Sequence, residues 1–340
     1  MCMSDLFHKL LILRTPGIGP VKYNDLINRF GNVGDAAESL KSDVAHFDVV
    51  RREMDLATKL NIHYIEDTDS RYPNRLKEIK NHPPVITARG NIDVLSRPIV
   101  SMVGTRHATA AGMEFVSRMA NEFAMRGIAV ASGMAVGTDS AAHRGALKAG
   151  GNLQTVAVLA GGVDYVWPFE NESLYHQILE RGVVISEMPV GFVPVATNFV
   201  QRNRHVAGIC EKLILGEADL KSGSMTTARF AISYGRPVFA VPSHPSDARS
   251  IGPNTLIQSG EAKLCMGITD FFDVKESKNK KSLEKNDSEN VLLDKLGMIP
   301  VSESVLAEIV KKTISEIKSE LVVLELQGLV RKVDGGYVRV

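Results

Sequence analysis

The side chains best suited to chemistry in this sequence form two polar clusters that lie close together in the chain. One is the basic run Arg202-Asn203-Arg204, and the other is the hydroxyl-rich segment 221–227. Ser222-Gly223-Ser224 stands where a helix is predicted to begin, so that hydroxyls, free N–H groups and the helix dipole act on one anion. Guanidinium groups add charge-assisted hydrogen bonds to it. The clusters predict a phosphate site with these candidate contacts: Arg202, Asn203, Arg204, Lys221, Ser222, Gly223, Ser224 and Thr227.

A structural role for one of the two arginines is an open alternative. Arg202 or Arg204 could form a salt bridge with Glu187 or Glu217, which lie on either side of them in the chain. Such a pair would explain one arginine but not the whole polar cluster.

Three further glycine-containing segments follow predicted strands. In the first, Val103-Gly104-Thr105-Arg106, the glycine lets a ligand approach the backbone and the guanidinium of Arg106 can donate two parallel hydrogen bonds. An ordinary strand-to-helix turn would have a similar sequence. Segment 132–139 leads into a helix with His143, for which a structural role is equally open. Segment 160–169 holds Trp167, the only tryptophan, whose ring either stacks on a base or packs in the core. The candidate contacts here are Gly104, Thr105, Arg106, Gly161, Gly162 and Phe169.

The elements that must position these segments alternate between strands and helices. Nearly all-apolar strands separated by amphipathic helices predict a mainly parallel sheet covered on both faces, which is a Rossmann-like, doubly wound α/β fold. The carboxyl ends of such strands share one edge, so we expect the polar segments to converge on one crevice. Strands are predicted at 99–103, 128–131, 155–159, 183–186, 212–215 and 237–241, and helices at 110–125, 139–148, 172–179 and 225–233.

A small helical domain is predicted before this sheet. Helices over 6–13 and 22–29 flank the turn Pro16-Gly17-Ile18-Gly19-Pro20, and the second ends at Gly31. Such a turn either holds a phosphate on its N–H groups or serves only for packing. We assign residues 1–90 to this helix-hairpin-helix domain with a lead-in, and residues 91–274 to the Rossmann-like domain that carries the predicted phosphate site.

The C-terminal part of the sequence predicts a winged helix. Residues 275–286 are a flexible linker, because the stretch to residue 290 is almost free of apolar side chains. Residues 287–340 then predict helices at 290–296, 302–310 and 313–326 and a hairpin at 329–340. This domain has seven basic and nine acidic residues. The spacing of its third helix predicts that Ile314, Ile317, Leu321 and Leu324 are in the core and that Glu316, Lys318 and Glu320 are exposed. Because exposed acidic residues repel phosphates, this favours a protein-contact module over duplex DNA binding.

Composition excludes several classes of protein. The 340 residues are 44% hydrophobic and 23% charged, with a net charge of +1, so neither disorder nor a strongly basic nucleic-acid binder is indicated. Apolar runs are too short for a membrane span and polar residues come too early for a signal peptide, so we expect a cytoplasmic protein without membrane association. The three cysteines are far apart, which suggests no disulfide framework and no metal site.

Signatures of catalysis and of cofactor binding are missing from the sequence. It has no GxxxxGK[ST], GxSxG or HExxH motif and no acidic ribose ligand of a dinucleotide fold. Asp139, Asp164 and Glu187 are available for acid–base work, but no nucleophile or metal cluster accompanies them. We therefore expect a binding protein, with no cofactor and no enzymatic activity.

Several segments together make the sequence similar to one known family. VGTR at 103–106, SGMAVGTDSAAHRGAL at 132–147, AVLAGGVDYVWPFEN at 157–171, QRNRHVAGI at 201–209 and GEADLKSGSMTTA at 216–228 resemble the DNA-processing protein A (DprA/Smf) family. The resemblance covers nearly the whole chain. Three segments depart from the family's usual residues: Val241-Pro242-Ser243, Gly137-Thr138-Asp139 and Trp167-Pro168-Phe169. The last change leaves one phosphate contact open.

The resemblance implies a cytoplasmic, homodimeric, non-catalytic protein of natural transformation. It would bind single-stranded DNA in the Rossmann-like pocket, protect it and help to load the recombinase RecA. The alternative from a different class is a nucleotide-processing hydrolase related to phosphoribohydrolases, with Glu187 or Asp164 as acid–base group, although the expected PGGxGT signature is absent.

Overall fold

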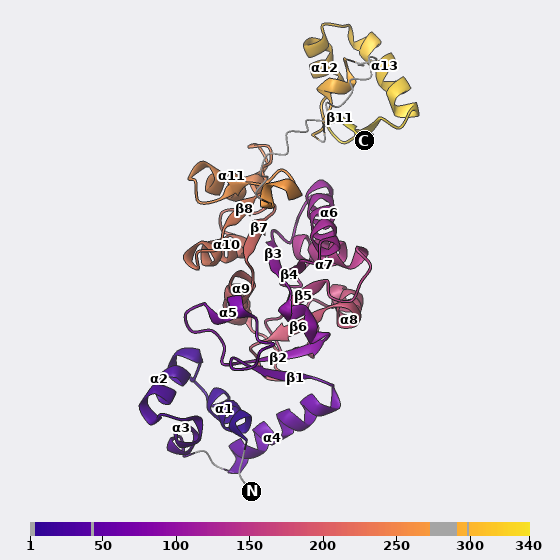
Figure 1. Cartoon of the computed structure of the whole chain (residues 1–340). Helices are drawn as coiled ribbons and strands as arrows, with labels where there is room; N and C mark the ends of the chain where they lie inside the picture. The colour runs from indigo at the N-terminus through magenta and orange to yellow at the C-terminus, as the bar shows by residue number, and fades with distance from the viewer. Residues whose placement is uncertain (1–3, 42–43, 273–290, 298) are drawn as a thin grey trace. The chain divides into compact units, whose positions relative to one another are not determined.

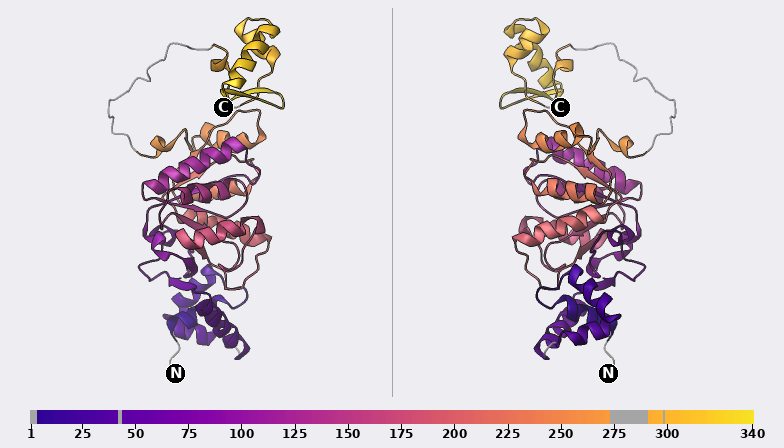
Figure 2. Two further views of the ribbon diagram at one scale, coloured as in Figure 1. Left: turned by 90° about the vertical axis from the view of Figure 1, so that its right-hand side faces the viewer. Right: turned by 90° about the vertical axis from the view of Figure 1, so that its left-hand side faces the viewer.

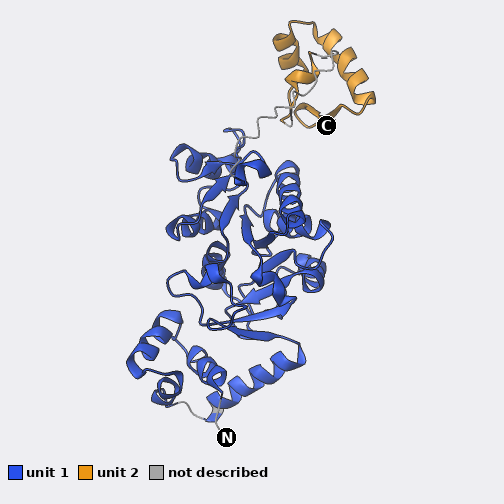
Figure 3. Cartoon of the chain, in the orientation of Figure 1, with its two compact units in different colours: residues 1–273 blue, residues 274–340 orange. Residues whose placement is uncertain are grey.

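A computed structural model describes residues 4–41, 44–272, 291–297 and 299–340 (Figure 1). The chain divides into two compact units, residues 1–273 and residues 274–340, which are coloured separately in Figure 3. The predicted linker, residues 275–286, lies outside the described residues. No helix among the described residues is long and apolar enough to cross a membrane.

One sheet organises the first unit, and its strands follow the order β1-β2-β6-β5-β4-β3-β7-β8-β9. The pairings from β6 to β9 are all parallel, whereas β2 pairs antiparallel with both β6 and β1. The mainly parallel, doubly wound sheet is thereby confirmed. Its strands are β1 (His63–Glu66), β2 (Val85–Gly90), β3 (Ile99–Val103), β4 (Ala129–Ser132), β5 (Thr155–Val158), β6 (Val183–Ser186), β7 (Lys212–Leu215), β8 (Val238–Ala240) and β9 (Lys263–Leu264).

Helices cover both faces of this sheet, as Figures 1 and 2 show. Successive side chains of a strand point to opposite faces. In β3, Ile99 and Val103 belong to one apolar core, and Val100 and Met102 to the other. One face is covered by α6 (Ala110–Met125), α7 (Thr138–Lys148) and α8 (Glu172–Arg181), and the other by α5 (Asn74–Lys77), α9 (Ala196–Gly208), α10 (Gly223–Ser233) and α11 (Ile251–Gln258). The sheet unit also contains four short 3-10 turns: η1 (Ile92–Ser96), η2 (Phe169–Asn171), η3 (Ala248–Ser250) and η4 (Ile268–Phe271).

Two parts of the sheet unit differ from the sequence-based expectation. The sheet extends into residues 63–90 through β1 and β2, which the sequence analysis grouped with the helical domain. The Arg202-Asn203-Arg204 run, for which no helix was predicted, lies inside helix α9. That helix begins after Pro194, where the Asn198 side chain accepts a hydrogen bond from the Val195 amide at 2.9 Å. Its C-terminal half is buried against the sheet through Val206 and Ala207.

The N-terminal helices form a small cluster at one end of the sheet unit (Figure 2). The predicted pair is confirmed as α1 (Asp5–Leu13) and α2 (Pro20–Phe30), and α2 ends at Gly31 with a left-handed φ of 80°. Two further helices, α3 (Val33–Ser39) and α4 (Val44–Lys59), were not predicted. This cluster packs against the sheet through Val85 and Tyr64.

The second unit is a winged helix, as predicted. It contains α12 (Glu303–Val310), α13 (Ile314–Leu326) and the hairpin of β10 (Val330–Val333) and β11 (Gly336–Arg339). In place of the helix predicted over 290–296, the described residues hold only the 3-10 turn η5 (Leu293–Lys295). Ile317, Leu321 and Leu324 are buried as expected, but Ile314 is exposed because it opens α13.

We expect Gly145→Ala to lower the free energy of unfolding by about 1–3 kcal/mol, the usual cost of overpacking. A Cβ on Gly145 would lie 2.6 Å from Ser117 Cα of α6 and would overlap the Ser117 carbonyl oxygen. Gly34→Ala, in the open helix α3, is the matched control and should be neutral or stabilising because alanine favours helix. Urea unfolding of both variants checks this, and equal effects would contradict the close α6–α7 packing.

Candidate functional site

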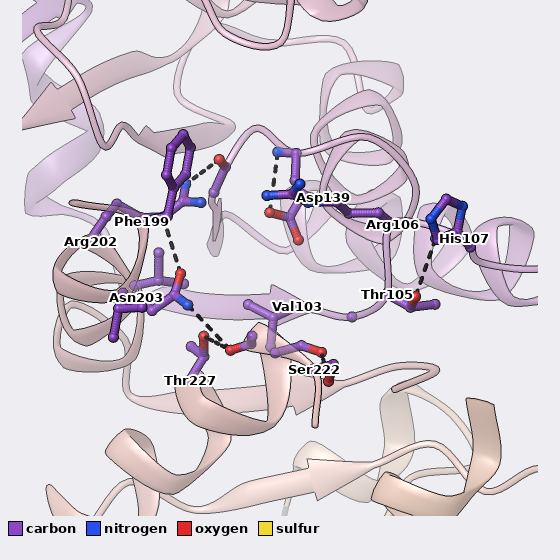
Figure 4. A pocket seen from close by; sticks show the side chains of 17 residues that line it. Val103, Thr105, Arg106, His107, Asp139, Phe199, Arg202, Asn203, Ser222 and Thr227 are labelled. Atoms are coloured by element: carbon purple, nitrogen blue, oxygen red, sulfur yellow. Dashed lines mark hydrogen bonds between the residues drawn. The ribbon is translucent and has the colours of Figure 1, made fainter. Parts of the chain in front are cut away.

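A cavity of about 330 Å³ opens at the carboxyl end of β3, between the loop that follows this strand and helices α9 and α10 (Figure 4). This is the edge at which ligands bind in open α/β sheets. The structure brings together most of the candidate residues here. Those that line the cavity are Gly104, Thr105, Arg106, Arg202, Asn203, Ser222, Gly223, Ser224 and Thr227.

The loop after β3 forms the first wall and is held by backbone hydrogen bonds. The Thr105 amide donates to the Glu217 carbonyl at 2.6 Å, and the Thr105 carbonyl accepts from the Thr138 amide at 3.2 Å. Gly104 lies so close to Thr138 that any Cβ would overlap the threonine side chain. The loop therefore presents a fixed backbone to the cavity, and glycine is required at its first position.

Arg106 extends from this wall without an ionic partner. Its guanidinium carbon lies 5.4 Å from the centre of the Trp167 ring, within the range of a cation–π contact. No described residue forms a salt bridge or a hydrogen bond with the Arg106 side chain. Its positive charge is thus available to an anion in the cavity.

The second wall is the N-terminus of α10. Ser222 caps the helix by accepting a hydrogen bond from the Met225 amide at 3.3 Å, and its hydroxyl lies 2.8 Å from that of Ser224. The Gly223 carbonyl accepts hydrogen bonds from Asn203 Nδ2 at 3.2 Å and from the Thr227 hydroxyl at 3.1 Å. The hydroxyls and the first amides of this helix form the anion-binding arrangement that the sequence predicts.

Arg202 forms the floor of the cavity and is almost fully buried. Its Nη1 donates to the carbonyl oxygens of Gly133 and, at 2.7 Å, of Val158, and its Nε donates to Asn203 Oδ1 at 3.2 Å. Burial lowers the pKa of Arg202 and raises that of Asp139, the acidic residue in the cavity lining. Nη2 has no partner among the described residues. Arg202 is therefore mainly a structural anchor, and the two N–H bonds of its Nη2 remain available to a ligand.

Arg204 does not line this cavity. It lies on the other side of α9, where its Nη2 donates to the Asn81 carbonyl at 2.8 Å and is 3.7 Å from Glu187. Burial raises the pKa of Glu187 and lowers the pKa of His205, which lies 3.2 Å from the same carboxyl group. The pairing with Glu187 that the sequence left open is confirmed for Arg204. Glu217 instead accepts a hydrogen bond from the Thr109 amide at 2.7 Å.

Four other candidates lie outside the cavity lining. Gly161 borders a narrow space beside it, together with Trp167. A Cβ on Gly162 would lie 2.6 Å from the Pro189 carbonyl oxygen, so this glycine is needed for packing. Phe169 is 70% exposed, and Lys221 is exposed in the turn before α10.

Sequence reasoning missed a set of residues on α9. Phe199, Val200 and Val206 line the cavity, and the ring of Phe199 lies 4.7 Å from that of Trp167. Residues 199, 202, 203 and 206 have the spacing of one helix face, a signal that would have found them if this segment had been recognised as helical. The lining residues His107, Ala135 and Asp139 were also not selected as contacts.

His143 has a structural position. It is fully buried, its Nδ1 lies 2.7 Å from the Thr155 hydroxyl, and burial lowers its pKa to about 3. Within the described ranges, no group of three histidine, cysteine or acidic side chains is placed to bind a metal ion. The cavity thus combines fixed amides, hydroxyls and a free cation. Fold and site together define a Rossmann-type protein with a polar pocket at the carboxyl end of its parallel strands.

Three family models match the chain and together cover almost all of it. The model described as DNA recombination-mediator protein A matches residues 63–276, the DprA winged helix domain matches 276–336, and the DprA-like N-terminal HHH domain matches 4–55. The chain belongs to the DNA recombination-mediator protein A (DprA) family.

Similar proteins agree with this assignment. The chain is 34% identical over 245 residues to DNA processing protein DprA of Bacillus subtilis, with 72% of this chain and 82% of that protein covered. It is also 33% identical over 245 residues to Protein Smf of Synechocystis. That match covers 71% of this chain but only 56% of the Synechocystis protein. The structure of DNA processing protein A from Streptococcus pneumoniae superposes with a TM-score of 0.65 at 30% identity, covering 79% of this chain and 97% of that one.

A second similar structure is that of DNA processing protein A from Helicobacter pylori, which was determined to explain how that protein binds single-stranded DNA. It superposes with a TM-score of 0.57 at 30% identity and covers 62% of this chain and 94% of that one.

We expect Arg202→Ala to lower the free energy of unfolding by about 3–5 kcal/mol, because it leaves buried polar groups without their cationic partner. Arg106→Ala, which removes only the contact with Trp167, should change it by no more than about 1 kcal/mol. Denaturant unfolding of the two variants makes the comparison. An Arg202→Ala protein of wild-type stability that binds ligand poorly would identify Arg202 as a ligand contact rather than an anchor.

Proposed function

We propose that this protein is a single-stranded DNA-binding recombination mediator and that the DNA backbone occupies the cavity between β3, α9 and α10. The observation that carries the proposal is Arg106, a cation without an ionic partner in the described residues, held over Trp167 at a wall of fixed backbone amides. Phosphate contacts of this type carry little base information, so binding should be sequence-tolerant. The single-stranded DNA binding described for the similar Helicobacter pylori protein supports the same ligand.

The proposal extends to the setting of this activity. Family membership supports a homodimer that acts in the cytoplasm, protects incoming DNA during natural transformation and helps to load RecA onto it. The protein would act by binding alone, without catalysing a reaction and without a cofactor. The winged helix would contact a protein, since its acidic side chains oppose phosphate binding.

The alternative, a nucleotide-processing hydrolase, was expected to use Glu187 or Asp164, and the acidic residue that does line the cavity, Asp139, is buried and accepts a hydrogen bond from the Ala135 amide at 3.3 Å. Glu187 contacts Arg204 and His205 on the far side of α9, and Asp164 accepts a hydrogen bond from the Gly191 amide at 2.9 Å. Neither carboxyl group lines the cavity. This arrangement favours binding over hydrolysis.

A titration with a single-stranded oligonucleotide tests the function directly. Trp167 is the only tryptophan of the chain and contacts Arg106, so its fluorescence should report DNA in the cavity. The logarithm of affinity should fall with the logarithm of salt concentration by about 0.7 per neutralised phosphate. Salt-independent binding, or turnover of a nucleoside monophosphate in a parallel assay, would overturn the proposal.

We expect Arg106→Ala to weaken single-stranded DNA binding by about 1.5–3 kcal/mol, or roughly ten- to a hundredfold, and to make the salt dependence shallower by about 0.7. Lys148→Ala is the matched control because Lys148 is exposed at the end of α7 and does not line the cavity. Fluorescence anisotropy of a labelled oligonucleotide compares the two. Equal affinities would remove Arg106 from the site.

A further inference from the structure

A second and larger cavity lies between the N-terminal helices and the sheet. Its volume is about 750 Å³, more than twice that of the first cavity. One wall is the turn between α1 and α2, residues 13–22, and the other comes from β2, the segment after β6, and α9. None of the interactions described so far assigns it a role.

The turn side of this cavity carries a cation without an ionic partner. Lys22 lies at the start of α2, and its ammonium group would be 3.8 Å from a Cβ placed on Gly17, so it folds over the turn. Among the described residues, Lys22 forms no salt bridge and no side-chain hydrogen bond. The other cation on this wall, Arg14, is neutralised by Glu53, whose carboxyl oxygens lie 2.7 and 2.8 Å from its guanidinium nitrogens.

The opposite wall carries Arg204, whose side chain is 20% exposed. Its acidic partner, Glu187, is more deeply buried, and burial raises the pKa of that carboxyl group. The charged residues in the cavity lining are thus Arg14, Lys22, Glu187 and Arg204, and among the described residues Lys22 is unpaired. This balance favours an anion.

Apolar side chains line the cavity together with these cations. Among them are Met188, Phe192 and the prolines at 16, 20, 83, 84 and 189. Alternating apolar surface and positive charge suits a chain in which flat bases alternate with phosphates, and it suits an isolated phosphate ion less well.

Helix α9 connects the two cavities. Val200 and Asn203 line the first, and Gln201 and Arg204 line the second, so neighbouring residues of one helix contribute to both. Val195, which precedes the helix, and Val200, in its N-terminal half, are 60% and 52% exposed. A strand that leaves the first cavity over this half of α9 therefore reaches the second without crossing the sheet.

We propose that the cavity between the α1–α2 turn and α9 is a second subsite for the same single-stranded DNA, in which Lys22 contacts a phosphate of the strand beyond the first cavity. This inference rests on the proposed function, because it assumes that DNA occupies the first cavity. It adds the N-terminal domain to the DNA path and makes affinity depend on the length of the strand.

The test compares two lengths of oligo-deoxythymidine, of about 6 and about 20 nucleotides, since single binding folds span about 4–16 nucleotides. Lys22→Gln should weaken binding of the longer strand roughly five- to tenfold and leave the shorter strand within about twofold of wild type. Lys59→Gln, an exposed lysine of the same domain at the end of α4, is the matched control and should change neither. Gln201→Glu tests the other wall and should likewise weaken only the longer strand.

The outcomes separate this inference from the proposed function. If the wild-type protein binds neither oligonucleotide, the proposed function fails. If it binds both but Lys22→Gln and Gln201→Glu leave the longer strand unaffected, or weaken both lengths equally, the second subsite is wrong and the proposed function stands. A loss confined to the longer strand supports the subsite, and thermal unfolding of each variant confirms that the loss is not a loss of folding.

Discussion

The buried guanidinium of Arg202 is the interaction on which the rest of the site depends. It connects helix α9 to the backbone just beyond β4 and at the end of β5, through the carbonyl oxygens of Gly133 and Val158. A side chain at Gly133 would overlap the guanidinium, so this glycine and this arginine require each other. Charge-assisted hydrogen bonds to carbonyl groups make such burial tolerable. Because α9 is held there, Phe199 and Asn203 are placed at the cavity.

The two arginines of one motif thus have separate tasks, and neither is the free cation of the first cavity. Arg202 holds the sheet, Arg204 pairs with Glu187 on the other side of the helix, and the unpaired charge comes from Arg106. With a net charge of only +1, the protein has no general attraction for polyanions. Affinity for DNA must therefore arise locally, from a few cations and from backbone amides whose positions are fixed by the fold.

The sequence was sufficient for the central strands and for most of the cavity, because apolar periodicity and strand order are local properties that place carboxyl ends at one edge. It failed for α9, since the polar run at its centre conceals a helix that is defined by burial against the sheet. The strands β1 and β2 were also missed, because β2 gains its place from antiparallel pairing with β6, which is distant in sequence, and β1 joins the sheet only through β2. Which arginine is free depends on tertiary partners that spacing does not reveal.

The surface of the winged helix is acidic and apolar, unlike the cavity of the sheet unit, and this difference limits what it can contact. On α13, Val322, Val323 and Leu326 are exposed, the last by 84%, on the same helix as Glu316 and Glu320. Exposed apolar side chains on an acidic helix suit a protein partner and repel a phosphate backbone. In the sheet unit, by contrast, the cavity walls combine amides with unpaired positive charge. On the proposed function, the chain would separate its recognition of nucleic acid from its recognition of protein by giving each a different domain.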